Sequence, residues 1–339
     1  MNKLQLEHIN ADFKNRFPDL ENFASLKNKT VFITGASGFI GQWLLLCFAF
    51  LNNKHAFNIK IIASSRSFEK NSVVDSINEN GNFIFDEIDV RYSFDIPTDC
   101  EYIIHLAASP DRRVHASSPL DVIRTNIDGT ENILRVATRL EKLKKVLVFT
   151  SGHTHGKLKR NTDMYAPGSC LNFSASYTES KRVAETLCHI YASHYQVPVG
   201  IVRPYSFIGP LQDLDRPWAI NNFINGALLN QNIKVVGNPD TKKSFLYPTD
   251  MVHLILDYLI SDNTEVPLEL GSTEIVSLQE VAESIARQVD TGVCIEYSDK
   301  ERKTGVHDFY PLKEEATSNM LFEECISRSL IWFKINNEQ

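Results

Sequence analysis

Short apolar runs alternate with longer stretches of helical spacing from Lys29 onward. The runs are rich in Val, Ile and Phe and have the length of strands; they cover residues 30–34, 59–64, 83–88, 102–106, 145–150 and 199–203. Predicted helices fill the gaps between them at residues 39–51, 121–140 and 176–195. Continuous apolar strands separated by helices predict an α/β fold, a doubly wound parallel sheet of the Rossmann type with helices on both faces. Ligands bind such a sheet at the carboxyl ends of its strands.

The first predicted strand runs directly into a glycine-rich turn. Gly35, Gly38 and Gly41 form the pattern G-x-x-G-x-x-G between that strand and a helix. Glycine is needed where the chain turns sharply and where backbone must approach a pyrophosphate. The free N–H groups and the positive dipole end of the following helix favour the same phosphate. The turn predicts a dinucleotide site with contacts from Gly35, Ser37, Gly38, Phe39, Ile40 and Gly41.

The alternation also divides the chain into parts. Residues 1–28 precede it and predict a helical N-terminal extension. We expect residues 29–210 to form the dinucleotide-binding Rossmann domain. The alternation is looser after Gly209-Pro210, so we expect residues 211–339 to form mainly a smaller α/β substrate lobe, with some segments returning to the first domain.

The end of the second predicted strand bears on the choice of dinucleotide. NAD enzymes usually carry an acidic residue there, which accepts a hydrogen bond from the ribose 2′-OH. This strand ends Ala63-Ser64-Ser65-Arg66, without a carboxylate. Arg66 is placed to meet a 2′-phosphate, so the predicted cofactor is NADP or NAD, with NADP favoured. A solvated Arg66, or one that stacks on adenine, is the alternative.

Tyr177 and Lys181 form a Y-x-x-x-K motif within a predicted helix. The i, i+4 spacing puts both side chains on one helix face. A free tyrosine has a pKa of about 10, and a nearby ammonium together with a positive nicotinamide ring stabilises the phenolate. Tyr177 can then take a proton from a sugar hydroxyl while a hydride leaves for the cofactor. The motif predicts a catalytic Tyr177 and a Lys181 that also binds the nicotinamide ribose.

The glycine turn and the Y-x-x-x-K motif together resemble the extended short-chain dehydrogenases/reductases, the NAD(P)-dependent nucleotide-sugar epimerase/dehydratase family. The resemblance runs from about residue 30 to residue 332. It implies a nucleoside-diphosphate sugar as substrate and a homodimer paired through residues 121–140 and 176–195. It also implies further cofactor contacts at Asp89, Val90, Leu106, Ala107, Ala108, Asn126 and Pro204.

The resemblance supplies a third catalytic position. The segment Thr150-Ser151-Gly152-His153 is similar to the family's S-T-D-E, which places Ser151 on the catalytic hydroxyl. That hydroxyl would hydrogen-bond the reacting oxygen. The acid and base that dehydratases use are replaced by Gly152 and His153. His153 is a candidate replacement acid or base, because a histidine titrates near neutral pH.

Other departures fall on the expected substrate pocket. His155 replaces a tyrosine of the family pattern, and Ser206 replaces an asparagine that normally touches the substrate. The resemblance implies substrate contacts at Ser109, Ser206, Lys243 and Arg302, the last two as ligands of the diphosphate. Lys243 keeps the charge of the usual arginine but loses its bidentate geometry.

These observations favour an epimerase that oxidises C4 transiently and returns the hydride to the other face of the sugar. Net 4-keto reduction and 4,6-dehydration are the alternatives within the family, and the replaced carboxylates disfavour dehydration and decarboxylation. A non-catalytic NAD(P)-sensing or structural relative is the alternative of another class. The presence of both Tyr177 and Lys181 argues for an enzyme.

Composition and charge limit the partners and the cellular compartment that we expect for this chain. The chain has 339 residues and a net charge of −7, which excludes the broad basic face of a nucleic-acid-binding protein. Its six cysteines are scattered without the spacing of zinc ligands, as expected for reduced thiols in the cytoplasm, and we expect no metal site. Residues 43–51 form the longest apolar run, which is shorter than the ~20 residues that cross a bilayer, so no membrane partner is expected.

Overall fold

A computed structural model of the chain describes residues 1–68, 73–77, 81–159, 164–166, 170–171, 175–264, 266–289, 292–298, 308–312 and 320–337. Seven parallel strands form its main sheet, in the spatial order β12-β8-β5-β4-β1-β2-β3. Their bounds are β1 (Thr30–Thr34), β2 (Lys60–Ser65), β3 (Phe83–Glu87), β4 (Tyr102–His105), β5 (Lys145–Phe149), β8 (Val199–Pro204) and β12 (Leu268–Leu270). The predicted Rossmann-type sheet is confirmed.

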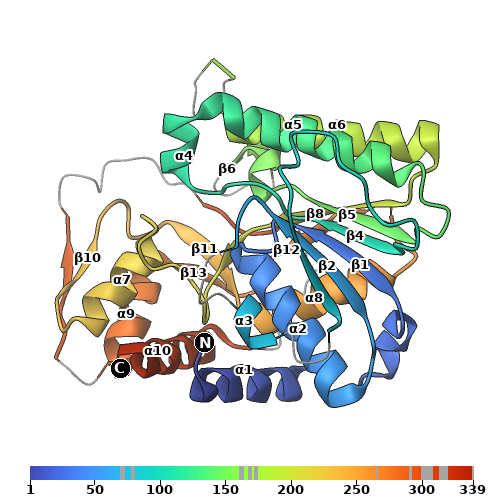
Figure 1. Cartoon of the computed structure of the whole chain (residues 1–339). Helices are drawn as coiled ribbons and strands as arrows, with labels where there is room; N and C mark the ends of the chain where they lie inside the picture. Colours follow the sequence, from blue (N-terminus) through green and yellow to red (C-terminus); the bar gives the residue numbers. More distant parts are fainter. Residues whose placement is uncertain are drawn as a thin grey trace.

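Helices cover both faces of this sheet (Figure 1). α5 (Pro119–Ala137) and α6 (Ser176–Tyr195) lie on one face, and α2 (Phe39–His55) and α8 (Pro248–Ile260) lie on the other. β1 is buried along its whole length because it has helices above and below and strands on either side. α2 is apolar nearly all round for the same reason: it packs between the sheet and further helices.

A smaller lobe lies beside the carboxyl ends of the strands (Figure 1). Its helices are α7 (Ala219–Leu228), α9 (Leu278–Gln288) and α10 (Phe322–Asn337). Its strands are β9 (Ser206–Phe207), β10 (Ile233–Val235), β11 (Lys242–Leu246), β13 (Ile275–Ser277) and β14 (Ile295–Tyr297), which pair as β13-β11-β9 and β10-β14. β12 and α8 come from the same half of the chain, but they lie in and against the main sheet.

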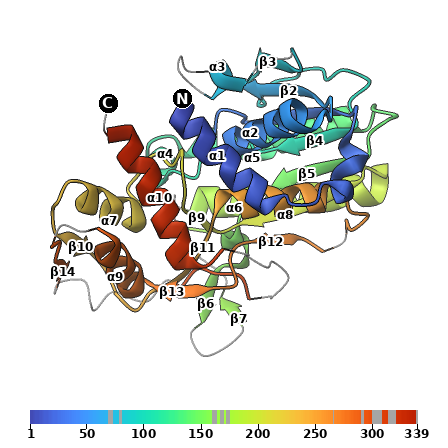
Figure 2. The same cartoon turned by 90° about the horizontal axis from the view of Figure 1, so that it is seen from below.

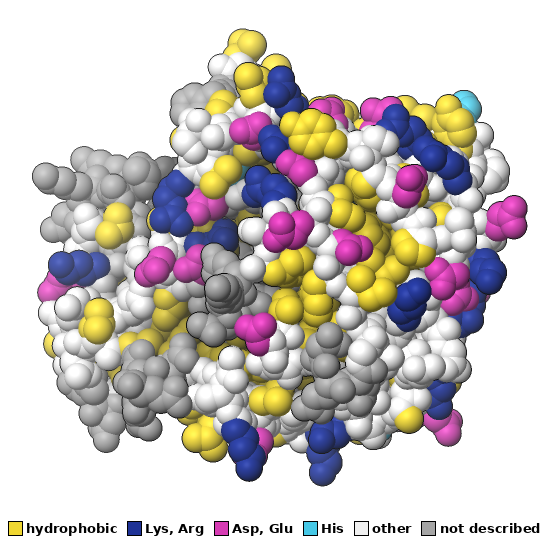
Figure 3. Space-filling model, in the orientation of Figure 1, with side chains coloured by type: hydrophobic (Ala, Val, Ile, Leu, Met, Phe, Trp, Pro, Cys, Tyr) yellow, Lys and Arg dark blue, Asp and Glu magenta, His cyan; other side chains and the backbone are white. Residues whose placement is uncertain are grey.

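Short elements complete the fold. These are α3 (Val74–Ile77), α4 (Arg112–Ser117), the strand pair β6 (Lys157–Lys159) and β7 (Met164–Ala166), and the 3₁₀ turns η1 (Glu21–Leu26) and η2 (Gly152–His155). The face of the molecule in Figure 3 carries Lys and Arg interspersed with Asp and Glu. Within the described residues, no helix is both long enough and apolar enough to cross a bilayer.

The N-terminal helix α1 (Lys3–Arg16) joins the two parts of the molecule. It begins with a capping box between Asn2 and Gln5 and contacts α2 and α8 on one side and α10 on the other (Figure 2). Its buried Asp12 accepts a hydrogen bond of 2.6 Å from the Tyr247 hydroxyl and forms an ion pair with Arg328 of α10. α1 is therefore packed into the fold on both sides.

Candidate active site

The glycine turn leaves room for a ligand at the start of α2. Gly35 has a φ of +67°, and a Cβ on it would lie 2.8 Å from the backbone nitrogen of Ala107. A Cβ on Gly41 would lie 2.6 Å from the Cα of Ala36, so glycine lets α2 approach the turn. Gly38 is the N-cap of α2, and no side chain caps the helix. The N–H groups of its first turn therefore remain available to a pyrophosphate.

Hydrogen bonds connect the carboxyl ends of β1 and β4 next to this turn. The Thr34 hydroxyl lies 2.7 Å from Nδ1 of His105 and accepts a hydrogen bond of 3.3 Å from the Ala107 backbone. Burial, and to a lesser extent the charge of Lys181, lowers the pKa of His105 to about 3, so this histidine is neutral. The bonds fix the predicted cofactor contacts Leu106, Ala107 and Ala108 against the glycine turn.

α6 brings the predicted catalytic groups together at the end of β5. Ser151 follows β5 and hydrogen-bonds Tyr177, while the Lys181 ammonium lies 6.0 Å from the centre of the Tyr177 ring. Lys181 donates a 2.7 Å hydrogen bond to the carbonyl of Phe149, and burial lowers its pKa to about 8. Burial raises the pKa of Tyr177, and the bond with Ser151 opposes that rise. Tyr177 therefore needs further positive charge nearby to act as a base, and an oxidised nicotinamide would supply that charge when bound.

Two side chains that the motifs do not reveal pack around these groups. His115 of α4 stacks on the Tyr177 ring at 4.6 Å, with 14° between the planes, and its Nε2 lies 2.7 Å from the carbonyl of Ser109. Phe309 stacks on His153 at 4.0 Å. The sequence offered no signal for either residue, because both come from segments outside the recognised motifs.

His153 lies in η2, between the aromatic ring and a group of cations. Burial, and to a lesser extent the charges of Lys243, Arg112 and His115, lowers its pKa to about 4. At neutral pH the imidazole is therefore uncharged. It can accept a proton or donate an N–H hydrogen bond, but it does not begin a reaction as a protonated acid.

Arg112 and Lys243 are two further cations of the site, and the Asp308 carboxylate lies near enough to Lys243 to oppose the lowering of its pKa. Neither side chain forms an ion pair or a hydrogen bond within the described residues. The Lys243 ammonium lies 5.3 Å from the centre of the Phe309 ring, and burial together with the charge of Arg112 lowers its pKa to about 8. Their neighbours Arg113 and Arg216 pair with Asp111 and Asp213 instead. Unpaired cations of this kind suit an anionic ligand.

The remaining predicted residues fall around the same edge of the sheet. Nη2 of Arg91 lies 2.6 Å from Oδ2 of Asp89 and forms an ion pair with it. This contact lowers the pKa of Asp89, and the charge of the exposed Arg66 lowers it further. The Ser37 hydroxyl lies 2.6 Å from that of Ser65. Other positions are as follows: Val90 packs on Gly129, Asn126 donates to Ser180, Phe39 stacks near Phe207, Ile40 is half-buried, Pro204 ends β8, and Ser206 lies in β9. Arg302 lies outside the described residues.

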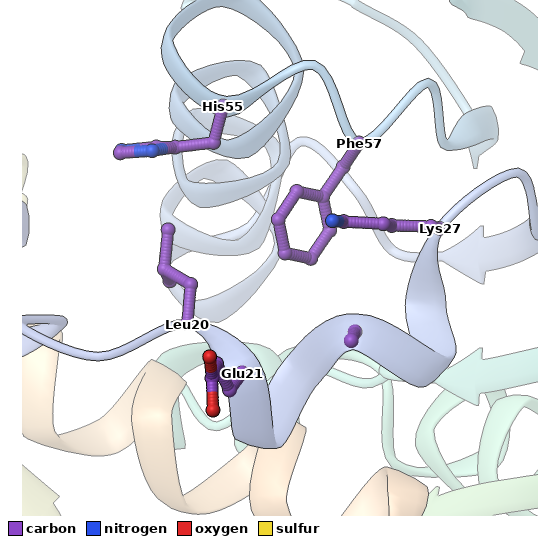
Figure 4. Close-up of a pocket in the computed structure, with 6 residues that line it drawn as sticks. Leu20, Glu21, Lys27, His55 and Phe57 are labelled. Atoms are coloured by element: carbon purple, nitrogen blue, oxygen red, sulfur yellow. The ribbon is translucent and has the colours of Figure 1, made fainter.

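A separate hollow lies at the opposite end of α2. It has a volume of about 540 Å³ and is lined by Leu20, Glu21, Ala24, Lys27, His55 and Phe57 (Figure 4). His55 ends the helix whose first residue is Phe39, so the hollow is on the order of 25 Å from the glycine turn. No predicted site residue lines it. The described residues contain no group of three His, Cys, Asp or Glu side chains that could hold a metal ion.

The arrangement fits a dinucleotide. An uncapped helix start and backbone contacts that only glycine permits would hold the pyrophosphate. A serine, a tyrosine and a lysine from β5 and α6 meet at the same edge of the sheet. This set can remove a proton from a hydroxyl and stabilise the oxygen while the carbon is oxidised.

Solved structures share the fold along nearly the whole chain. UDP-glucuronic acid 4-epimerase from Bacillus cereus, in complex with UDP-glucuronic acid and NAD, aligns with a TM-score of 0.73 and 17% identity over 91% of this chain and 99% of that one. dTDP-glucose 4,6-dehydratase from Bacillus anthracis, in complex with NAD, aligns with a TM-score of 0.72 and 20% identity over 91% and 98%.

Curated relatives resemble the sequence at a similar distance. UDP-N-acetyl-alpha-D-glucosaminuronate decarboxylase from Bacillus cytotoxicus is 27% identical over 90% of this chain and 98% of its own length. UDP-glucuronic acid decarboxylase 1 from Xenopus tropicalis is 25% identical over 85% of this chain and 67% of its own length. The model of the NAD dependent epimerase/dehydratase family matches residues 31–267. With the glycine turn and the Ser151, Tyr177 and Lys181 site on the same sheet edge, the chain belongs to this family of enzymes.

Proposed function

We propose that the protein transiently oxidises C4 of a nucleoside-diphosphate sugar and that the net reaction is epimerisation at C4. The observation that supports this most is the contact of Ser151 with Tyr177, with Lys181 one helical turn further on. When bound, the nicotinamide ring accepts and returns a hydride. Tyr177 takes the proton of the C4 hydroxyl, and Ser151 holds the same oxygen. The 4-keto sugar then rotates within the site, so that the hydride returns to the opposite face of C4.

The residues beside Ser151 argue against dehydration. Gly152 has no side chain to carry a proton, and His153 is uncharged at neutral pH. Decarboxylation of a sugar acid is the second candidate, because the relatives above include decarboxylases of UDP-glucuronic acid and of a related uronic acid. A 4-keto uronic acid is a β-keto acid, so CO₂ can leave without a separate base. Arg112 and Lys243, which form no ion pair within the described residues, favour an anionic substrate, and both the diphosphate expected at Lys243 and the carboxylate of a uronic acid carry that charge.

Product analysis tests the proposal. The purified chain is incubated with UDP-glucuronic acid and either dinucleotide, and CO₂ release, absorbance at 340 nm and sugar identity are measured. A C4 epimer without CO₂ supports epimerisation, while a pentose with one CO₂ per turnover supports decarboxylation. Steady net consumption of reduced cofactor would mean a reductase, and a 4-keto-6-deoxy product from a neutral sugar would mean a dehydratase.

Tyr177→Phe is the matched variant, since it removes only the phenolic hydroxyl. We expect its kcat to fall by about 10²- to 10⁴-fold, the range for loss of a general base. Cofactor binding, followed by fluorescence, should change little. Turnover at the wild-type rate would contradict the catalytic assignment.

The cofactor preference is a separate proposal. NADP is supported by Arg66 and by the absence of a carboxylate from the end of β2, whereas the solved relatives above contain NAD. Arg66→Asp should weaken binding of NADP relative to NAD in a direct titration. An unchanged ratio would contradict a role for Arg66.

We also propose a cytoplasmic homodimer that pairs through α5 and α6. Support comes from large apolar side chains exposed on these helices, namely Leu120, Val183, Ile190 and Tyr195. Sedimentation should give twice the 38.5 kDa of one chain. A mass of one chain at micromolar concentration would contradict the dimer.

A further inference from the structure

A second polar network lies next to the catalytic residues, and it includes His155, which the motif comparison placed at the substrate pocket. Its centre is Glu269 of β12, whose exposed fraction is 6%. The other members are Glu185 of α6, Arg203 of β8, Tyr205 just after β8, and His155 at the end of η2. A buried carboxylate is costly unless donors surround it, so its partners show what the charge holds in place.

Glu269 accepts hydrogen bonds on both of its oxygens. Nε2 of His155 lies 2.9 Å and Nη1 of Arg203 lies 3.0 Å from Oε1, and the Tyr205 hydroxyl donates to Oε2 over 2.8 Å. Burial alone would raise the pKa of Glu269, but the bonds from His155, Tyr205 and Arg203 leave it below its ordinary value. The group is therefore a carboxylate at neutral pH. Because a carboxylate only accepts, Nε2 of His155 must carry the hydrogen of that bond.

The network continues to the helix that carries the catalytic pair. Arg203 donates to both oxygens of Glu185, over 2.9 Å from Nε and 2.7 Å from Nη2. Glu185 lies one helical turn beyond Lys181 and accepts a 2.8 Å bond from the Thr150 hydroxyl. Thr150 immediately precedes Ser151. Arg203 thus ties the end of β5 and α6 to Glu269.

Glu269 also supports the other side of Ser151. The Tyr205 ring fills the space beside Gly152 so closely that a Cβ on that glycine would lie 2.6 Å from ring atoms. The same ring packs against Phe309 at 4.8 Å. His155 anchors the far end of η2, the turn that Ser151 caps by accepting a bond from the His153 backbone. Two of the three partners of Glu269 therefore hold the turn that presents the Ser151 hydroxyl.

We propose that Glu269 is a positioning residue for Ser151, which acts through His155 and Tyr205 to hold the serine hydroxyl on Tyr177. This rests on the proposed function, because the position matters through the reaction at Tyr177. Glu269 itself touches neither the substrate nor the cofactor. Its effect should therefore appear in the chemical step and should depend on the presence of Ser151.

Glu269→Gln tests the idea with almost no change in volume. The amide presents a donor where Oε2 accepted, so the Tyr205 hydroxyl has to accept from it instead of donating, and the negative charge that holds His155 and Arg203 is lost. We expect kcat to fall by about 10- to 100-fold, as for a misplaced catalytic group, while KM for the sugar nucleotide changes less than about twofold. In a Ser151→Ala background the same substitution should have no further effect on kcat, because the group it positions is gone.

A readout that needs no turnover separates this proposal from the proposed function. The bond with Ser151 lowers the pKa of Tyr177. The absorbance titration of Tyr177, taken as the difference from Tyr177→Phe, should therefore move to higher pH in Glu269→Gln and in Ser151→Ala alike. If the wild type turns over no sugar nucleotide, the proposed function fails, and this titration still decides the positioning role.

Glu101→Gln is the control. Glu101 pairs with Lys29 at 2.8 Å at the opposite end of the main sheet, and its side chain is 14% exposed. That variant should leave both kcat and the Tyr177 titration unchanged. An equal loss of kcat with and without Ser151, or a Tyr177 midpoint that does not move, would overturn the proposal. Should Glu269→Gln fail to fold, His155→Phe breaks one of the same bonds and the same expectations apply.

Discussion

At the scale of single residues, burial sets the protonation states of the site. His105 and His153 are both kept neutral by loss of solvent, and nearby positive charges act in the same direction. Lys181 also has a lowered pKa, of about 8, which leaves most of it protonated at pH 7. The site therefore combines neutral imidazoles with a cation beside Tyr177.

His153 should make folding stability depend on pH. Its pKa of about 4 in the fold is below the ordinary value of 6.5, so the unfolded chain binds one more proton between those pH values. Stability therefore rises with pH across this window and is lost as the pH falls. His153→Phe keeps a ring to stack on Phe309 and should flatten the slope by up to about 1.4 kcal/mol per pH unit.

Urea unfolding of both proteins at pH 7, 6 and 5 measures the two slopes. The difference between them removes the contributions of the carboxylates, which the two proteins share. Equal slopes of unfolding free energy against pH for the wild type and His153→Phe would contradict a lowered pKa of His153 in the fold.

At the scale of elements, the glycine turn controls how closely α2 packs on β1. A Cβ on Gly41 would lie only 2.6 Å from Ala36, which is shorter than a van der Waals contact. A Cβ on Gly226 of α7 would have its nearest neighbour at 3.4 Å, an ordinary contact distance. Gly41→Ala must push α2 away from the turn, and the cofactor site lies at that helix start.

We expect Gly41→Ala to cost about 1–3 kcal/mol in the free energy of unfolding, as overpacking does, and to weaken dinucleotide binding. Gly226→Ala is the matched control and should be neutral or stabilising by up to about 1 kcal/mol, because alanine favours a helix. Thermal unfolding and a dinucleotide titration measure both effects. Equal behaviour of the two variants would mean that the turn is not tightly packed.

Elements with strong local patterns were predicted well. The strands that open at Thr30, Phe83, Tyr102, Lys145 and Val199 begin at the predicted residues, and α6 has the predicted bounds. The three residues of β12 carry too short a pattern to be recognised, and their place in the sheet depends on pairing with β8. The sequence likewise placed Ser151, Tyr177 and Lys181 in one site. It missed His115, Phe309 and Glu269, because contacts between distant segments leave no periodic signal.

At the scale of the whole molecule, α1 connects the main sheet to the smaller lobe. Asp12 bonds Tyr247, which precedes α8, and pairs with Arg328 of α10, while Arg16 lies 2.5 Å from Asp250 of α8. The side chain of Asp12 is nearly inaccessible to solvent, at 1%. An unpaired charge at that depth is strongly unfavourable.

Arg328→Met should therefore destabilise the protein by about 3–5 kcal/mol, the cost of leaving a buried charge without its partner. Arg287→Met is the comparison, since Arg287 pairs with Glu323 on the surface, where such a pair contributes about 1 kcal/mol or less. Denaturant unfolding of the two variants measures the difference. Similar losses would mean that Tyr247 and His8, whose Nε2 lies 3.7 Å from Asp12, satisfy the carboxylate without Arg328.

The pairing of Asp12 with Arg328 has a consequence for synthesis on the ribosome. The two residues are 316 positions apart. At about 5–20 residues per second, α1 is made roughly 16 to 60 seconds before its partner. During that interval the nascent chain must keep the Asp12 carboxylate and an apolar helix face out of other associations, and the contact closes only once α10, which carries Arg328 in its second turn, has been made.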